Sequence, residues 1–518
     1  MRRLLAWAST LGDRVNSVAV KEFRQAVQSR WVIAVLMLFL LINLVVIGGY
    51  LMLSPDAATD TTGGRKIFVI LQSVLTLTCI AFVPAYTGLR LSLERNNADV
   101  DLLFITTLTP GAIIRGKFVT ATALTLLIFS VCMPFMVLTY LLRGIDLPTI
   151  FGILGYSFAL CTLANTMGLF AGSVSGSWFI RGLIIVGVIV VLLYMTVGLL
   201  GIAQSVLIFG GASFWTGMLG WWGIGTALLF GCLGIGLFYV LAVALMSPKT
   251  SNRMLVPRLY MTAAFLITGV VMLGWSWVQP HELVLAPWVV LSGVCLGVLV
   301  IAALGERDSW SVRVRRTIPR TPVLRGLAFL FYSGSAGGIA WCVLLLAGVG
   351  ATVLFRNAIA RPGVHGFDVM ETFGYTSLFF GYILCYCLTT AALRPVLFRN
   401  VPTPHLSVVA LFLGAMMCMG PCLAAFFFDQ YLWSNMQWYM LGSPMVLSTT
   451  DHEAIVTGGV VVAVWLVIAV AASFRWALDQ WRRFLPYEVI EPDSEASEER
   501  VPVANAEPLG EGVGHQAP

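Results

Sequence analysis

Long uncharged stretches of apolar residues alternate with short polar segments along the whole chain. Twelve stretches have 17 or more residues: 31–53, 67–89, 118–142, 149–174, 182–207, 221–246, 259–278, 288–304, 327–355, 372–393, 407–428 and 455–474. About 20 apolar residues in a helix cross the hydrocarbon core of a bilayer. Lipid offers unpaired backbone groups no partner, and a barrel would show short alternating strands instead. We therefore expect an all-α polytopic membrane protein with about twelve transmembrane helices. The stretch 288–304 is the shortest, and 327–355 could begin as an interfacial segment.

Composition supports this interpretation and excludes other classes of protein. Of the 518 residues, 58% are hydrophobic and 11% are charged, whereas a soluble domain carries about 25% charged residues. All ten cysteines fall inside the apolar stretches, so the sequence shows no exported disulfide framework. Cys418 and Cys422 share a helix face without a nearby His or carboxylate, and we expect no metal site there.

The distribution of positive charge predicts the orientation. With the N-terminus in the cytoplasm, 26 of the 31 lysine and arginine residues fall in cytoplasmic segments. Such a bias is typical of the cytoplasmic side, so both termini are expected there. The predicted organisation is an amphipathic N-terminal helix (1–30), a six-span domain (31–246), a second six-span domain (247–474) and an acidic disordered tail (475–518). Residues 484–518 carry eight acidic residues and one arginine.

Several kinds of chemistry have no residues to support them. No apolar stretch contains Asp, Glu, Lys, Arg or His, which disfavours a proton relay through the membrane. Residues 111–117 resemble a phosphate-binding loop, but Phe118 stands where that loop requires Ser or Thr. The five histidines are scattered. We therefore expect no catalytic, cofactor, metal or nucleic-acid site, and any ATP hydrolysis that drives this chain should come from a partner.

An amphipathic segment precedes the first span. Val15, Ala19, Phe23, Ala26 and Val27 recur at helical spacing in residues 13–30. Lysine, arginine and glutamine occupy the other side. Such a helix is expected to lie in the plane of the cytoplasmic headgroups, either as an anchor or packed against a cytoplasmic partner.

The connection 90–117 is the most distinctive polar segment. Glu94 and Arg95 come first, and an apolar run at 100–105 follows. Thr109 and Pro110 have the residue types of an N-cap and a first helical position. Ile113 and Ile114 would then form an apolar spot on a short helix between two spans. A short capped helix of this kind suits docking into a groove of another protein.

At this point the sequence resembles the permease subunits of type-2 ATP-binding-cassette exporters. The resemblance covers residues 13–246. It rests on Lys21-Glu22-Phe23-Arg24-Gln25 before the first span, and on an ordered series in the connection. That series is Glu94-Arg95, Asp101-Leu102-Leu103, Thr106, Leu108-Thr109-Pro110, Ile113 and Gly116-Lys117. Thr107 stands where the family usually has its first proline.

The resemblance implies a function and a set of partners. The chain would be the membrane subunit of an exporter in a bacterial plasma membrane, surrounded by lipid and present as a homodimer or pseudo-dimer. A separate cytoplasmic ATPase would bind the connection 90–117, with Glu94, Arg95, Thr109, Pro110, Ile113, Gly116 and Lys117 as coupling residues. The N-terminal interfacial helix would contribute Lys21, Glu22, Phe23 and Arg24. The alternatives are a membrane-embedded scaffold or enzyme of the envelope, and a gradient-driven carrier.

The second half contains a faint echo of the same connection. Thirteen residues separate Glu306-Arg307 from Thr321-Pro322, and thirteen also separate Glu94-Arg95 from Thr109-Pro110. Residues 247–474 are therefore either a divergent repeat of the first domain or an extension of it.

The orientation is testable with a reporter fused to the C-terminus. A reporter that is active only outside the cytoplasm should give no signal in intact cells, because the positive-inside bias places this end in the cytoplasm. The same reporter fused into the segment 429–454, which is predicted to lie outside, serves as the positive control. A strong signal from the C-terminal fusion would overturn the orientation.

Overall fold

A computed structural model describes residues 17–53, 63–96, 109–142, 145–175, 178–208, 218–248, 250–278, 285–359, 369–428, 441–448 and 452–487. Every regular element in these ranges is helical. In chain order they are α2 (Ser17–Val27), α3 (Arg30–Leu53), α4 (Gly63–Asn96), α6 (Pro110–Leu141), α7 (Leu147–Ser173), α8 (Trp178–Ile208), α10 (Met218–Met246), α11 (Leu255–Val278), α12 (Leu285–Leu304), α13 (Val312–Arg315), α14 (Pro322–Phe331), α15 (Ser335–Ile359), α16 (Val369–Leu393), η2 (Thr403–His405), α17 (Leu406–Phe428), η4 (Pro444–Ser448) and α19 (His452–Arg483).

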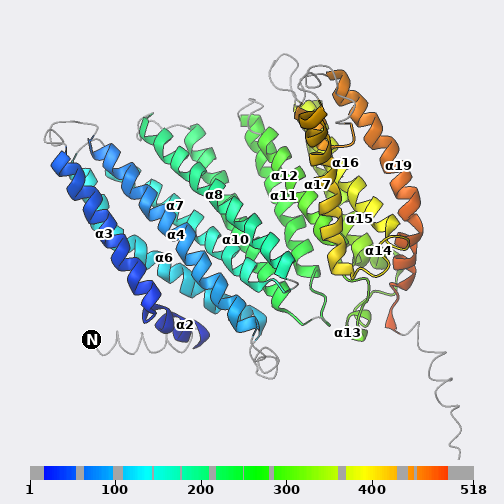
Figure 1. Ribbon diagram of the computed structural model, residues 1–518, viewed down its shortest axis with the longest axis horizontal. Helices are drawn as coiled ribbons and strands as arrows, with labels where there is room; N and C mark the ends of the chain where they lie inside the picture. The colour runs from blue at the N-terminus through cyan, green and yellow to red at the C-terminus, as the bar shows by residue number, and fades with distance from the viewer. Residues whose placement is uncertain are drawn as a thin grey trace, which may run out of the picture.

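Twelve of these helices are long and apolar enough to span a bilayer, which confirms the count expected from the sequence. The protein is thus a multi-pass membrane protein. The irregular stretch 327–355 resolves into two helices: α14 ends at Phe331, and the span α15 begins at Ser335. Figure 1 shows the spans as one tilted row, with α2 and the C-terminal end of α19 at the same end of the bundle. We call this end the predicted cytoplasmic end.

Two predicted boundaries are wrong. The described parts of the connection 90–117 are helical on both sides, because α4 continues to Asn96 and α6 runs unbroken from Pro110 to Leu141. The expected separate short helix is therefore the first turns of a span, since no proline interrupts α6 before Pro134. The predicted tail 475–518 also begins too early, because α19 continues to Arg483. Residues 97–108, 209–217 and 488–518 lie outside the described residues.

Glycine allows α4 and α7 to cross with their backbones in contact. A Cβ atom on Gly172 would lie 2.3 Å from the carbonyl oxygen of Gly88, and one on Gly168 would lie 2.6 Å from the carbonyl oxygen of Pro84. Small residues permit such close approach in membranes, where dispersion contacts replace the hydrophobic effect as the force between helices. This crossing holds the second and fourth spans together along the centre of the first domain.

The two six-span units share one packing scheme. In the first unit the spans are α3, α4, α6, α7, α8 and α10; in the second they are α11, α12, α15, α16, α17 and α19. In both units the second span packs on the first, third, fourth and fifth, and the fourth also packs on the third, fifth and sixth. The first span also touches the third in each. The units meet where α10 packs on α11, and they lie side by side in Figure 1.

The close crossing predicts the effect of adding a methyl group. Gly172→Ala should lower the stability of the protein by about 1–3 kcal/mol, because the backbone oxygen of Gly88 cannot move aside cheaply. The measurement is thermal unfolding in detergent. Gly155→Ala, on the same helix with nothing within 4 Å of the new Cβ, is the matched control and should be neutral or stabilising. Equal effects of the two substitutions would contradict the proposed crossing.

Candidate functional site

The amphipathic helix before the first span packs on the third span. Ala19 and Ala26 of α2 are buried, and Lys21, Phe23 and Arg24 are exposed. The hydroxyl of Thr120 on α6 donates a hydrogen bond to the carbonyl oxygen of Ala19 at 3.4 Å. The helix is thus present as predicted, but its buried face differs from the expected one. Glu22 lies on the buried face, whereas Phe23 is 38% exposed.

Lys117 explains why a carboxylate is buried there. Its Nζ lies 3.0 Å from Oε1 of Glu22 on α2 and 2.7 Å from Oε2 of Glu94 on α4. The Lys117 side chain is only 3% exposed. An ammonium group removed from water in this way is tolerated only when it is paired. Three helices far apart in the sequence are therefore joined through one cation.

Arg90 completes a cluster of four alternating charges. Its Nε lies 3.5 Å from Oε2 of Glu22 and 3.5 Å from Oε1 of Glu94. Its guanidinium also donates to the hydroxyl of Tyr86 at 3.1 Å and to the side-chain oxygen of Gln25. We call Glu22, Arg90, Glu94 and Lys117 the four-charge cluster. Two carboxylates balance two cations, so the cluster is neutral while its members hold α2 against α4 and α6.

A narrow crevice beside the cluster has room for about one water molecule. It is lined by Glu22, Ala26, Tyr86, Thr87, Arg90, Lys117 and Thr120. This size does not suit a solute, and the described contacts of the cluster are those that join α2, α4 and α6.

The start of α6 keeps part of the predicted geometry. Thr109 is the N-cap, and its Oγ1 accepts the amide hydrogen of Ala112 at 3.3 Å, with Pro110 in the first turn. Ile113 is half-buried, but Ile114 is fully buried and packs with Leu91, Leu169 and Ala242. The expected apolar spot thus divides: Ile114 belongs to the core, and Ile113 lies at its edge. Gly116 is buried in the same turn.

Residues 111–117 do not have the geometry of a phosphate-binding loop. They form the first two turns of α6, where amide groups bond within the helix, and Lys117 is held by two carboxylates. Arg95 belongs to α4, but its side chain lies outside the described residues, as does the matched series from Asp101 to Leu108.

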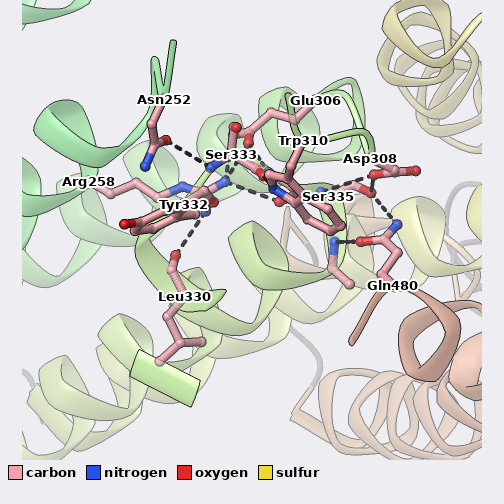
Figure 2. A network of polar contacts seen from close by, with 12 residues as sticks. Asn252, Arg258, Glu306, Asp308, Trp310, Leu330, Tyr332, Ser333, Ser335 and Gln480 are labelled. Carbon is pink, nitrogen blue, oxygen red and sulfur yellow. Dashed lines mark hydrogen bonds and ion pairs between the residues drawn. The ribbon is translucent and has the colours of Figure 1, made fainter. Parts of the chain in front are cut away.

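The second unit has its own buried ion pair at the predicted cytoplasmic end. Arg258 of α11 is 4% exposed, and its Nη2 lies 2.6 Å from both carboxylate oxygens of Glu306, which follows α12. The same guanidinium donates to the carbonyl oxygens of Leu330 and Tyr332 at 2.8 and 2.5 Å. Figure 2 shows these groups converging on the break between α14 and α15. Burial raises the pKa of Glu306, and Arg258 and the amide of Gly334 oppose that rise.

Further polar contacts close the network around this break. Asp308 accepts hydrogen bonds from the hydroxyl and the amide of Ser335, and it pairs with Arg394 at 3.4 Å. Gln480 of α19 donates to the hydroxyl of Ser335 at 2.8 Å and accepts the amide hydrogen of Ala336 at 3.0 Å (Figure 2). The last span is therefore fastened to the start of the third span of its unit.

The sequence echo between the halves marks a structural correspondence at its first residue. Glu94 lies in the last turn of the second span of its unit, and Glu306 comes just after the second span of the other. Each bonds to a residue at or just before the start of the third span. Glu94 reaches Lys117 of α6, whereas Glu306 reaches the amide of Gly334 at 2.8 Å before α15. Thr321-Pro322 begins α14 as Thr109-Pro110 begins α6, but α14 ends before the span starts. Sequence reasoning missed Arg258 and Arg90, whose only signal was a charge at the edge of an apolar stretch.

A double-mutant cycle measures the contact between α2 and α6. Glu22→Gln or Lys117→Met alone should destabilise the protein by about 3–5 kcal/mol, because each leaves a buried charge with fewer partners. The double variant should lose clearly less than the sum of the single losses, with a coupling of about 0.5–3 kcal/mol. Thermal unfolding in detergent is the measurement, and Arg24→Gln on the exposed face of α2 is the neutral control. Additive losses would show that the two residues do not interact.

Comparison of the chain with protein-family models, with curated proteins and with solved structures finds no match in any of the three. The function is therefore argued from the architecture and from the residues at the predicted cytoplasmic end.

Proposed function

We propose that this chain is the transmembrane subunit of an ATP-binding-cassette transporter that exports its substrate. It would form the translocation pathway and couple to a separate cytoplasmic ATPase. The proposal places it in a bacterial plasma membrane, assigns ATP hydrolysis to the partner and assigns no cofactor to this chain. The multi-pass architecture is compatible with a translocation pathway, because a pathway across the bilayer needs a bundle of spans.

One observation carries the proposal. The two segments that resemble the permease family are separated by about 70 residues in the sequence, yet they meet in space. Glu22 comes from the N-terminal segment, and Glu94 and Lys117 come from the two ends of the connection. A chance resemblance would give no reason for Glu22 and Glu94 both to pair with Lys117. Their contact supports the interpretation that both segments belong to one coupling element.

The geometry also supports a route by which a movement of the cytoplasmic ATPase would be transmitted to the spans. The four-charge cluster fixes α2 to the ends of α4 and α6. The α4–α7 crossing then connects these ends to the fourth span over its length. A load applied at the start of α6 or on α2 would therefore move the second, third and fourth spans as one body. Coupling of this kind requires rigid elements between the two sites.

The second unit bears on the oligomeric state of the proposed transporter. Because both units share one packing scheme and begin at the same end of the bundle, we propose that they act as a pseudo-dimer within one chain. Parallel repeats of this type place a pathway at the interface between the units. In this chain the interface includes α10 and α11.

The coupling role is tested by changing the start of α6. Ile113→Asp in the full chain should reduce co-purification with the proposed partner ATPase, because it places a charge on a half-buried apolar contact. Thr109→Ala, which removes the cap, should have a smaller effect, since the cap contributes about 0.5–2 kcal/mol to the helix. Membrane abundance should stay close to that of the parent, because the apolar stretches 67–89 and 118–142 are unchanged.

Val396→Asp is the matched control, because Val396 is an apolar residue that is 79% exposed at the same end of the second unit. Normal ATPase binding and ATP turnover by Ile113→Asp would exclude the coupling role. Val323→Asp on α14 distinguishes one ATPase site from two. Loss of binding there would assign a second docking element, and full retention would confine coupling to the first unit.

A further inference from the structure

The second unit carries an arginine-rich segment at the predicted cytoplasmic end. Between positions 307 and 325 the only acidic residue is Asp308, while six arginines are present: Arg307, Arg313, Arg315, Arg316, Arg320 and Arg325. Arg313 and Arg316 are exposed, and Asp308 pairs with Arg394. Within the part of the chain that the structure describes, no carboxylate pairs with Arg313, Arg315 or Arg316. Arg313, Arg315 and Arg316 therefore form a cationic surface that no described carboxylate neutralises.

The C-terminal end of the described chain lies on this surface. Phe484 is fully buried, and its ring centroid lies 5.0 Å from that of Trp310, 5.5 Å from that of Phe329 and 5.6 Å from that of Tyr332. Tyr487 follows Phe484 by three residues, and its ring centroid lies 5.2 Å from the guanidinium of Arg316. Tyr487, the residue to which the segment 488–518 is attached, therefore lies next to Arg316.

The residues that follow have the complementary charge. Positions 488–518 contain eight acidic residues and one arginine, against six arginines and one aspartate in the segment 307–325. A polypeptide of 31 residues can span about 30 Å without being fully extended. It can therefore reach every arginine of the segment from its attachment point. Tethering also gives the tail a local concentration on the order of millimolar at that surface, far above that of a free acidic partner.

We propose that the acidic tail, residues 488–518, docks on the arginine-rich segment 307–325 of its own chain and shields it from anionic lipid headgroups. Clusters of four or more arginines beside a membrane attract the anionic lipids of the cytoplasmic leaflet. The tail competes for the same guanidinium groups, and its attachment beside Arg316 favours it. This inference is independent of the proposed transport function, because it concerns only charge and attachment.

The test uses the full chain with a photo-crosslinking amino acid at position 494, in nanodiscs of phosphatidylcholine alone. Crosslinks should map to residues 312–325 of the same molecule. The triple variant Arg313→Gln, Arg315→Gln, Arg316→Gln should reduce their yield by about tenfold or more, because each of the three ion pairs with the tail contributes a factor of roughly two to five. Raised salt should have the same direction of effect. The control triple Arg24→Gln, Arg30→Gln, Arg399→Gln removes as many exposed charges elsewhere and should leave the yield unchanged.

A second variant keeps the inference testable if the triple variant folds poorly. Replacing Glu491, Asp493, Glu495, Glu498 and Glu499 by their amides alters only the tail, and it should lower the crosslink yield to the same extent. Replacing part of the phosphatidylcholine by phosphatidylglycerol should lower the yield in the parent, as lipid competes with the tail. Crosslinks to other segments, to a second copy, or at full yield in the neutralised variants would overturn the proposal. Crosslinks to lipid alone, even in the neutral nanodisc, would assign the surface to the membrane.

Discussion

Hydrocarbon offers the backbone no hydrogen-bond partner, and the rest of this structure follows from that constraint. Every crossing must be a helix, so the chain can vary only in which helices touch and how their ends are held. Two devices decide this in the first unit. Glycine at the α4–α7 crossing lets the backbones meet, and buried ion pairs fasten the ends. Neither device requires a charge at membrane depth, which is consistent with twelve apolar stretches free of ionisable residues.

Hydropathy reveals most of the fold because each span must satisfy the same length and polarity on its own. Hydropathy therefore identifies the short span at residues 285–304 as well as the longer spans. Helix ends follow a different rule, since a helix continues past the apolar core wherever its next residues are good helix formers. This is why α4 extends to Asn96 and α19 to Arg483, beyond the last apolar residue of each stretch. The pairing scheme that the two units share appears only once the chain is folded. In the sequence, the spacing of Glu306 and Thr321 is the one sign of it.

Part of the candidate site can be predicted from the sequence. The cap at Thr109 is local, so its residue types suffice to predict it. The four-charge cluster is not local: Glu22 and Lys117 are 95 residues apart, and periodicity alone assigns Phe23 to the buried face of α2. A carboxylate displaces an aromatic ring from that face because an unpaired buried lysine would cost more than an exposed phenylalanine. Arg258 was overlooked for a similar reason, since its burial depends on carbonyl groups 72 and 74 residues away.

The joining of two like units in one polypeptide has an evolutionary consequence. In an assembly of identical subunits, one codon sets the same residue in both halves, so neither half can specialise without the other. Here the two units share a packing scheme, but each has its own residues, which can change separately. Lys117 balances Glu94 in one unit, whereas Arg258 and a backbone amide balance Glu306 in the other. The covalent link also fixes the stoichiometry at one to one, so the two ends can serve different partners without any mechanism to sort mixed assemblies.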